Sequence, residues 1–366
     1  MKTRCITTPR IDWTGIKLAA TYLGAVVGAG FASGQEHLHF FGQFSPGGEL
    51  GVGMAGALFV VFGVLLADLV SRHRTSSPED LLGHIAGKAM TPVVDGLLSA
   101  FMFCSVCIML AGTVALFKEQ TSLPPDIGVG LTALVILVAC TRGVEGVFYL
   151  NALMSPVLLG APILVATLSL VQVRRGLLRP PCTPAPEVIV RNSLLPAWPV
   201  ASVLYVSYNL LIVIGTFASM GHELARARAA RRGAAMGGVA LTLFMAAIHV
   251  TLAVHGDAVW TTEVPMLLAA SRLGPGLRGL YSISLWCAMV TTAATGCFGL
   301  SRRLEKQSRL PQPAVAILVT ILAALLAQVG FASLVGRVYP VFGYLGLPLV
   351  FGIALASIRS RVTIIR

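Results

Sequence analysis

The stretch of sequence that decides the fold lies near the amino terminus and reads Gly24-Ala25-Val26-Val27-Gly28-Ala29-Gly30-Phe31-Ala32-Ser33-Gly34-Gln35-Glu36. It places four glycines within eleven positions of an apolar run that is long enough to cross a membrane. Each glycine inside a helix costs about 1 kcal/mol relative to alanine. Because polar side chains follow the glycines directly, the stretch predicts a span that unwinds near residue 28 and lines a cavity. Tight helix packing through glycines spaced four apart is the alternative interpretation.

A similar stretch lies almost two hundred residues later, and it reads Gly215-Thr216-Phe217-Ala218-Ser219-Met220-Gly221-His222-Glu223. Both stretches contain Phe-Ala-Ser within an apolar segment. Two interrupted spans at matching places in the two halves of a chain mark the substrate site of many secondary transporters. The sequence therefore predicts breaks close to 28–31 and 207–215.

The composition is that of an integral membrane protein, with 56% hydrophobic and 11% charged residues among 366 and a mean hydropathy of +0.83. The apolar segments are too long for the strands of an outer-membrane barrel, so the predicted class is all-α. Ten membrane spans are expected, at 15–41, 48–70, 92–117, 126–141, 147–171, 197–221, 234–255, 279–300, 312–330 and 335–358.

The long polar connection at 172–196 divides the ten spans into five and five. An odd number of spans in each half makes the second half enter the membrane from the opposite side, so repeated halves must be inverted. We expect one transmembrane domain, with one repeat at about 12–171 and the other at about 197–358.

Lys and Arg are more frequent in the loops on the amino-terminal side of the membrane, which predicts that both termini are cytoplasmic. The basic connection at 172–196 is the exception. The net charge of +12 is spread over short loops, as expected beside anionic lipid, and it predicts no nucleic-acid partner.

An unwound span exposes free carbonyls and free amides, which bind cations and anions respectively. The pattern Gly24-x-x-Val27-Gly28-x-Gly30 resembles the first-helix motif of the LeuT-fold sodium symporters. Residues Gly28 to Phe31 are similar to the carboxylate cradle of the amino acid, polyamine and organocation transporter superfamily. The whole string from Val27 to Glu36 most resembles the YkvI-type membrane proteins of bacteria.

The resemblance implies a LeuT-like arrangement of ten helices as a 5+5 inverted repeat, with helices 1 and 6 discontinuous, in the bacterial cytoplasmic membrane. Substrate would lie between these two helices. The expected substrate-binding residues come from both of them: Ala25, Gly28, Ala29, Gly30, Phe31, Tyr205, Ser207, Tyr208 and Asn209. Hydrogen bonding between helices is the alternative role for the polar residues of the sixth span.

The eighth span contains Ala288-x-x-Thr291-Thr292, which resembles the part of the sodium site that LeuT-type symporters share with the first helix. By that resemblance the Na+ ligands would be the carbonyls of Gly24, Val27 and Ala288 and the two hydroxyls. Uncharged oxygens suit a monovalent cation and not a transition metal. The alternative is that the threonines bond back to their own helix.

At the position of Phe31, symporters with a second sodium site have asparagine, so the resemblance implies at most one sodium site. Three ionisable residues are candidates for gating or proton coupling: Glu36, Glu223 and His249.

The sequence thus predicts a secondary active transporter, not an enzyme, that couples Na+ to the symport of a small amino-acid-like solute by alternating access. It is expected to be a monomer or a weak homo-oligomer. A transporter-fold ligand sensor of the germinant-receptor type and a proton-coupled transporter are the alternatives. A thiol oxidase using Cys104 and Cys107 is a weaker one, because two small apolar residues three apart on a helix face usually serve packing.

Overall fold

The computed structural model describes residues 13–44, 47–73, 78–87, 89–120, 124–178, 189, 191–221, 224 and 227–365, and its regular elements there are all helical. The α-helices are α1 (Trp13–Val26), α2 (Ala29–Ser33), α3 (Gln35–Phe40), α4 (Gly48–His73), α5 (Pro78–Ala86), α6 (Thr91–Gln120), α7 (Pro125–Thr141), α8 (Gly143–Arg174), α9 (Trp198–Ser219), α10 (Ala227–His255), α11 (Pro265–Leu273), α12 (Pro275–Gln307), α13 (Gln312–Leu326) and α14 (Phe331–Ile365). Short 3₁₀ helices lie at Gly42–Phe44, Gly256–Thr261 and Ala327–Val329.

Eight of these helices are long and apolar enough to cross a membrane: α4, α6, α8, α9, α10, α12, α13 and α14. Helix α7 is apolar but shorter. Large apolar side chains such as Leu134, Leu243 and Phe351 are exposed on the outside of the bundle, where a bilayer would cover them. The count of ten spans stays a prediction.

The first predicted span is broken near its middle, as expected. Helix α1 ends at Val26, and Gly28 is extended, with φ −103° and ψ −171°. The amide of Gly28 donates to the carbonyl of Val26. In a continuous α-helix it would donate to the carbonyl of Gly24 instead. A second break follows at Gly34, whose φ of 85° is left-handed and therefore favours glycine.

The prediction that the sixth span is interrupted at 207–215 is wrong, because α9 is one continuous helix from Trp198 to Ser219. Its polar side chains do not mark unwinding, since they find partners. Ser207 donates to the carbonyl of Gly343 in α14, and Asn209 donates to the carbonyl of Tyr205 one turn earlier. Within this helix Gly215 is the single glycine, so the dense glycines that break the first span have no counterpart.

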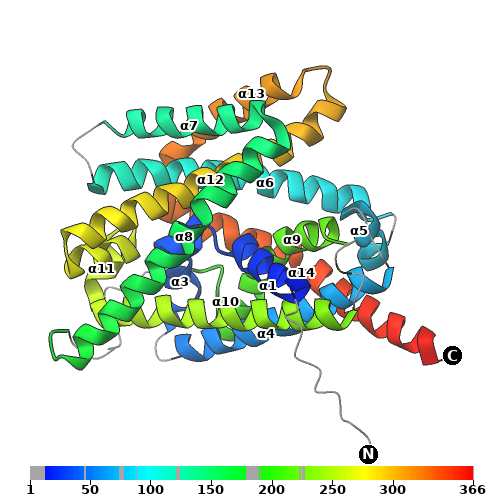
Figure 1. The fold of residues 1–366 in the computed structure, drawn as a ribbon, viewed down its shortest axis with the longest axis horizontal. Helices are drawn as coiled ribbons and strands as arrows, with labels where there is room; N and C mark the ends of the chain where they lie inside the picture. Colours follow the sequence, from blue (N-terminus) through cyan, green and yellow to red (C-terminus); the bar gives the residue numbers. More distant parts are fainter. Residues whose placement is uncertain are drawn as a thin grey trace, which may run out of the picture.

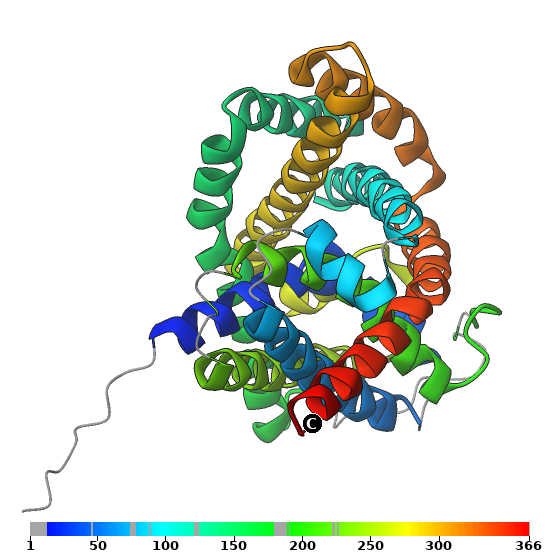
Figure 2. The ribbon, with the colours of Figure 1, turned by 90° about the vertical axis from the view of Figure 1, so that its right-hand side faces the viewer.

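The helices form two groups. Helices α1, α4, α9 and α10 pack together, while α6, α7, α8, α12 and α13 form a second packed group. Figure 1 shows α4 and α10 side by side along one edge and α7 and α13 at the opposite edge. The last helix, α14, lies beside α4 and α9 (Figure 2). Short helices α5 and α11 occupy corresponding places in the two halves of the chain, in keeping with the predicted repeat, which itself stays a prediction.

Helices α1, α4 and α10 approach each other closely through glycines. A Cβ at Gly238 of α10 would lie 2.7 Å from the Cα of Val60 in α4, and one at Gly233 would lie 2.5 Å from the carbonyl oxygen of Gly15 in α1. Small residues allow membrane helices to pack backbone against backbone. Glycines of α4 and α10 therefore serve packing, as does Gly343 of α14, where a Cβ would lie 2.8 Å from the carbonyl oxygen of Leu204.

Candidate functional site

The break in the first span positions a buried carboxylate. Glu36 lies in the first turn of α3 and is only 4% exposed. Its Oε2 accepts hydrogen bonds from the hydroxyls of Tyr205, at 3.1 Å, and Tyr208, at 2.6 Å, which both come from α9. The structure thus joins a predicted gating residue to two predicted substrate-binding residues.

The other oxygen of this carboxylate faces the backbone of α2. A Cβ at Gly30 would overlap Glu36 Oε1 and would lie 3.1 Å from Cε2 of Tyr339. Glycine at this position therefore provides the space for the carboxylate. Among the ion pairs of the described residues, none includes Glu36.

Aromatic rings surround the carboxylate. The rings of Tyr208 and Tyr339 are stacked, with centroids 4.7 Å apart and an interplanar angle of 9°. The ring of Phe40 lies 5.2 Å from that of Tyr205 and 5.7 Å from that of Tyr208. We call Glu36, Tyr205, Tyr208 and Tyr339 the Glu36 cluster.

Sequence reasoning missed Tyr339. It reaches the cluster from α14, which the resemblance did not mark as part of the site. Its sequence signal was a tyrosine hydroxyl inside an otherwise apolar span, next to Pro340. A polar group at membrane depth needs a partner or a wet cavity, so that signal could have been used.

Two of the predicted sodium ligands, Val27 and Thr292 of α12, lie at the same break. A Cβ at Gly28 would lie 3.4 Å from Oγ1 of Thr292, so this threonine faces the unwound backbone. The hydroxyl of Thr291 is buried and bonds back to the carbonyls of Cys287 and Ala288, at 2.9 and 3.1 Å. Val27 is buried at the break, and Gly24 is exposed at the surface of α1.

The remaining predicted residues of the first span do not all point at the Glu36 cluster. Phe31 is buried against the rings of His37 and Phe244. Ala29 is buried in α2, and Ala25 is half-buried in α1.

Two residues of α9 face other partners. Ser207 donates to Gly343 of α14, which is the alternative role expected for it, whereas Asn209 bonds back to Tyr205 within α9. Glu223 lies outside the described residues.

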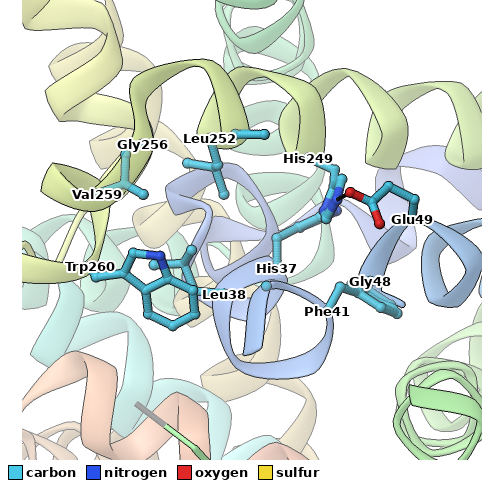
Figure 3. Close-up of a pocket in the computed structure, with 12 residues that line it drawn as sticks. His37, Leu38, Phe41, Gly48, Glu49, His249, Leu252, Gly256, Val259 and Trp260 are labelled. Atoms are coloured by element: carbon cyan, nitrogen blue, oxygen red, sulfur yellow. Dashed lines mark ion pairs between the residues drawn. The ribbon is translucent and has the colours of Figure 1, made fainter. Parts of the chain in front are cut away.

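His249 lies in a separate small cavity of about 40 Å³, large enough for a few water molecules. Figure 3 shows His249 beside Glu49, and the two side chains bring Nε2 and Oε1 within 3.8 Å of each other. His37 and Trp260 also line this cavity, which is formed by α3, α4, α10 and the 3₁₀ helix Gly256–Thr261. In the described part of the chain, no group of three or more His, Cys, Asp or Glu residues could hold a metal ion.

A larger cavity, of about 350 Å³, lies between α6, α9 and α12. Its lining includes Phe101, Leu211, Gly215, Thr295 and Arg303. The ring of Phe101 also lies 6.3 Å from the rings of Tyr208 and Tyr339. Phe101 therefore separates this cavity from the Glu36 cluster.

Two proteins of Bacillus subtilis (strain 168) are similar to nearly the whole chain. The uncharacterized membrane protein YkvI is 25% identical over 337 residues, covering 90% of this chain and 92% of YkvI. The uncharacterized protein YyaD is 27% identical over 355 residues, covering 95% of this chain and 98% of YyaD. No family model matches the sequence.

Three solved transporters have a similar fold. A Na+-coupled sialic acid symporter in a substrate-bound outward-open state matches with a TM-score of 0.61 and 14% identity, over 93% of this chain and 78% of that one. The manganese transporter of Eremococcus coleocola matches with a TM-score of 0.60 and 16% identity, over 94% of this chain and 80% of that one. MhsT in complex with L-phenylalanine matches with a TM-score of 0.59 and 17% identity, over 91% of this chain and 87% of that one. This chain is thus similar over nearly its whole length to the membrane protein YkvI, and its fold is similar to that of a Na+-coupled symporter.

Proposed function

We propose that the protein is a secondary active transporter that couples Na+ to the symport of a small, amino-acid-like organic solute by alternating access. The observation that carries the proposal is the break at Gly28, which has the Thr292 hydroxyl on one side and the Glu36 cluster close by. Interrupted helices place substrate and coupling ion next to each other in many secondary transporters. Similar folds in a Na+-coupled symporter and in an L-phenylalanine complex support it.

In this proposal the cation is bound by carbonyls of Gly24, Val27 and Ala288 and by the hydroxyls of Thr291 and Thr292. The hydrogen bonds that Thr291 donates to its own helix are compatible with this role. A hydroxyl that donates its proton keeps lone pairs that can accept. The back-bond also fixes the direction of that oxygen.

Replacing Thr291 and Thr292 together by alanine is expected to raise half-saturation by sodium at least tenfold. Each strong ligand lost from a partly desolvated cation costs on the order of 1 to 3 kcal/mol. Solute affinity should fall with it, because the coupling between two sites is reciprocal. A sodium titration of solute binding measures both effects.

The matched control is Thr251→Ala, since Thr251 is also buried and its hydroxyl also bonds back to its own helix, at Ala247. This variant should keep the sodium dependence of the parent protein. Equal sodium dependence in the double variant and the control would contradict the proposed ion site.

Uptake of a labelled amino-acid mixture into proteoliposomes tests the transport proposal itself. Accumulation driven by a sodium gradient is the expected result. Accumulation driven only by a proton gradient would favour the second candidate, a proton-coupled transporter. That candidate is supported by the buried carboxylate of Glu36 and by the contact of His249 with Glu49. Binding without accumulation under either gradient would point to a ligand sensor.

We further propose that the transporter lies in the bacterial cytoplasmic membrane with both termini in the cytoplasm, as the Lys and Arg distribution predicts. In this orientation the cavity beside Phe101 and Arg303 opens toward the cytoplasm, and the pocket of His249 lies near the outer surface. Labelling of single cysteines introduced at Arg303 and Glu49 would check the two sides.

A further inference from the structure

We propose that the Glu36 cluster binds the ammonium group of the solute, so that the transported compounds are organic amines and a solute carboxylate is not received at Gly28 and Gly30. This inference rests on the proposed function for the route of the solute. The binding step can be tested without transport.

The first argument is the unpaired charge of Glu36. The carboxylate is buried, both tyrosine hydroxyls donate to the same oxygen, and none of the ion pairs of the described residues reaches it. A buried carboxylate is costly unless a cation compensates it. The tyrosines orient the group but bring no positive charge, so a cationic ligand would complete the site.

The second argument concerns the cradle itself. The resemblance to amino acid transporters places a substrate carboxylate against the glycines of the first helix. Here the space beside Gly30 already holds Glu36 Oε1. A second carboxylate would lie next to the first, and like charges at such distances disfavour each other strongly. The charge of the site is thus opposite to the one that the resemblance implies.

The third argument is the set of rings around the carboxylate. Tyr208 and Tyr339 are stacked, Phe40 lies against Tyr208, and Phe101 lies near both tyrosines. Aromatic faces carry negative potential and attract organic cations, and the attraction is stronger away from water. A carboxylate among aromatic rings therefore favours an ammonium group, with its apolar substituents, over a small inorganic ion.

The test compares probes that differ in charge but hardly in shape, using the purified full-length chain in lipid nanodiscs. Phenethylammonium is phenylalanine without its carboxylate, phenylpropionate is phenylalanine without its amine, and phenethyl alcohol is an uncharged analogue. Choline and its uncharged carbon isostere, dimethylbutanol, form a second pair. Calorimetric titration and the midpoint of thermal unfolding measure binding.

We expect at least one cationic probe to bind and to raise the unfolding midpoint, while the acid and the neutral analogues do not. Glu36→Gln should weaken that binding at least tenfold, and Glu145→Gln, which removes an exposed carboxylate of α8, should leave it unchanged. Equal binding of neutral and cationic probes, binding of the acid alone, or no binding of any amine would overturn the proposal.

A second variant protects the test if Glu36→Gln does not fold. Tyr339→Leu removes a ring without changing any charge, and it should weaken the binding of the cationic probes several-fold. Tyr149→Leu, at an exposed position of α8, serves as its control. If Tyr339→Leu binds the cations as well as the parent protein does, the ring cage is not the ammonium site.

The two proposals fail in different ways. Amine binding without accumulation in proteoliposomes would overturn the transport proposal and keep the ammonium site. Sodium-driven uptake of carboxylates without amine binding would overturn the ammonium site and keep the transport proposal. If Na+ or lowered pH alone stabilises the parent protein but not Glu36→Gln, and no amine does so, the carboxylate serves the coupling ion instead.

Discussion

Replacing Gly30 by alanine is expected to abolish solute binding while the protein still folds. The added Cβ would overlap Glu36 Oε1 and press on the ring of Tyr339. The carboxylate must then leave its position and lose hydrogen bonds to two tyrosines. Hydrogen bonds to a charged group contribute about 1.5 to 3 kcal/mol each, so a solute ammonium group that loses its bonds to the displaced carboxylate loses about 3 kcal/mol or more, which corresponds to at least hundredfold weaker binding. Calorimetric titration would measure it.

Gly130→Ala in α7 is the matched control, because a Cβ there meets nothing within 4 Å. Size-exclusion profiles of the two variants should be similar, while the unfolding midpoint of Gly30→Ala should lie below that of Gly130→Ala because it loses hydrogen bonds of Glu36. Gly30→Leu should behave like Gly30→Ala or worse. Wild-type affinity in Gly30→Ala would show that the position of the Glu36 carboxylate does not govern solute binding.

The second large effect concerns folding. Gly238→Val should strongly reduce the yield of folded protein, because its Cβ would lie 2.7 Å from the Cα of Val60 and backbone atoms cannot give way as a flexible side chain can. Overpacking of an interior typically costs about 1 to 3 kcal/mol, and more where a backbone must move. The midpoint of thermal unfolding in detergent measures the loss.

Gly53→Val provides the comparison, since Gly53 lies on the exposed face of α4 and a Cβ there meets nothing within 4 Å. It carries the same change of side chain in a membrane helix without the collision. If both variants had equal midpoints, α4 and α10 would not be in backbone contact.

The sequence predicted the break of the first span because its signal is local. Four glycines followed by polar residues weaken a helix wherever it is packed, and the chain unwinds at Gly28. The sixth span carried a weaker signal. Its polar residues could mark either a break or contacts between helices, and the structure shows contacts, at Gly343 and at Glu36.

The partners of Glu36 depend on tertiary structure and could be predicted only in part. Tyr205 and Tyr208 were expected near the substrate through the resemblance. Tyr339 could not be paired with Glu36, because nothing in the local sequence tells which helices lie side by side. The negative charge beside Gly30 could not be predicted from the sequence either, since it depends on the turn at Gly34 that brings Glu36 back over Gly30.

The left-handed turn at Gly34 has a mechanical consequence. It joins α2 to α3, so the carboxylate and the glycine that it covers belong to one short piece of chain, from Gly30 to Glu36. The tyrosines belong to α9 and α14. A tilt of the first helix would carry the negative charge along with its backbone as one body and stretch its links to the hydroxyls of Tyr205 and Tyr208. The charge would then move together with the helix. The hydrogen bonds between Glu36 and the tyrosine hydroxyls would break when the helix tilts and form again when it returns.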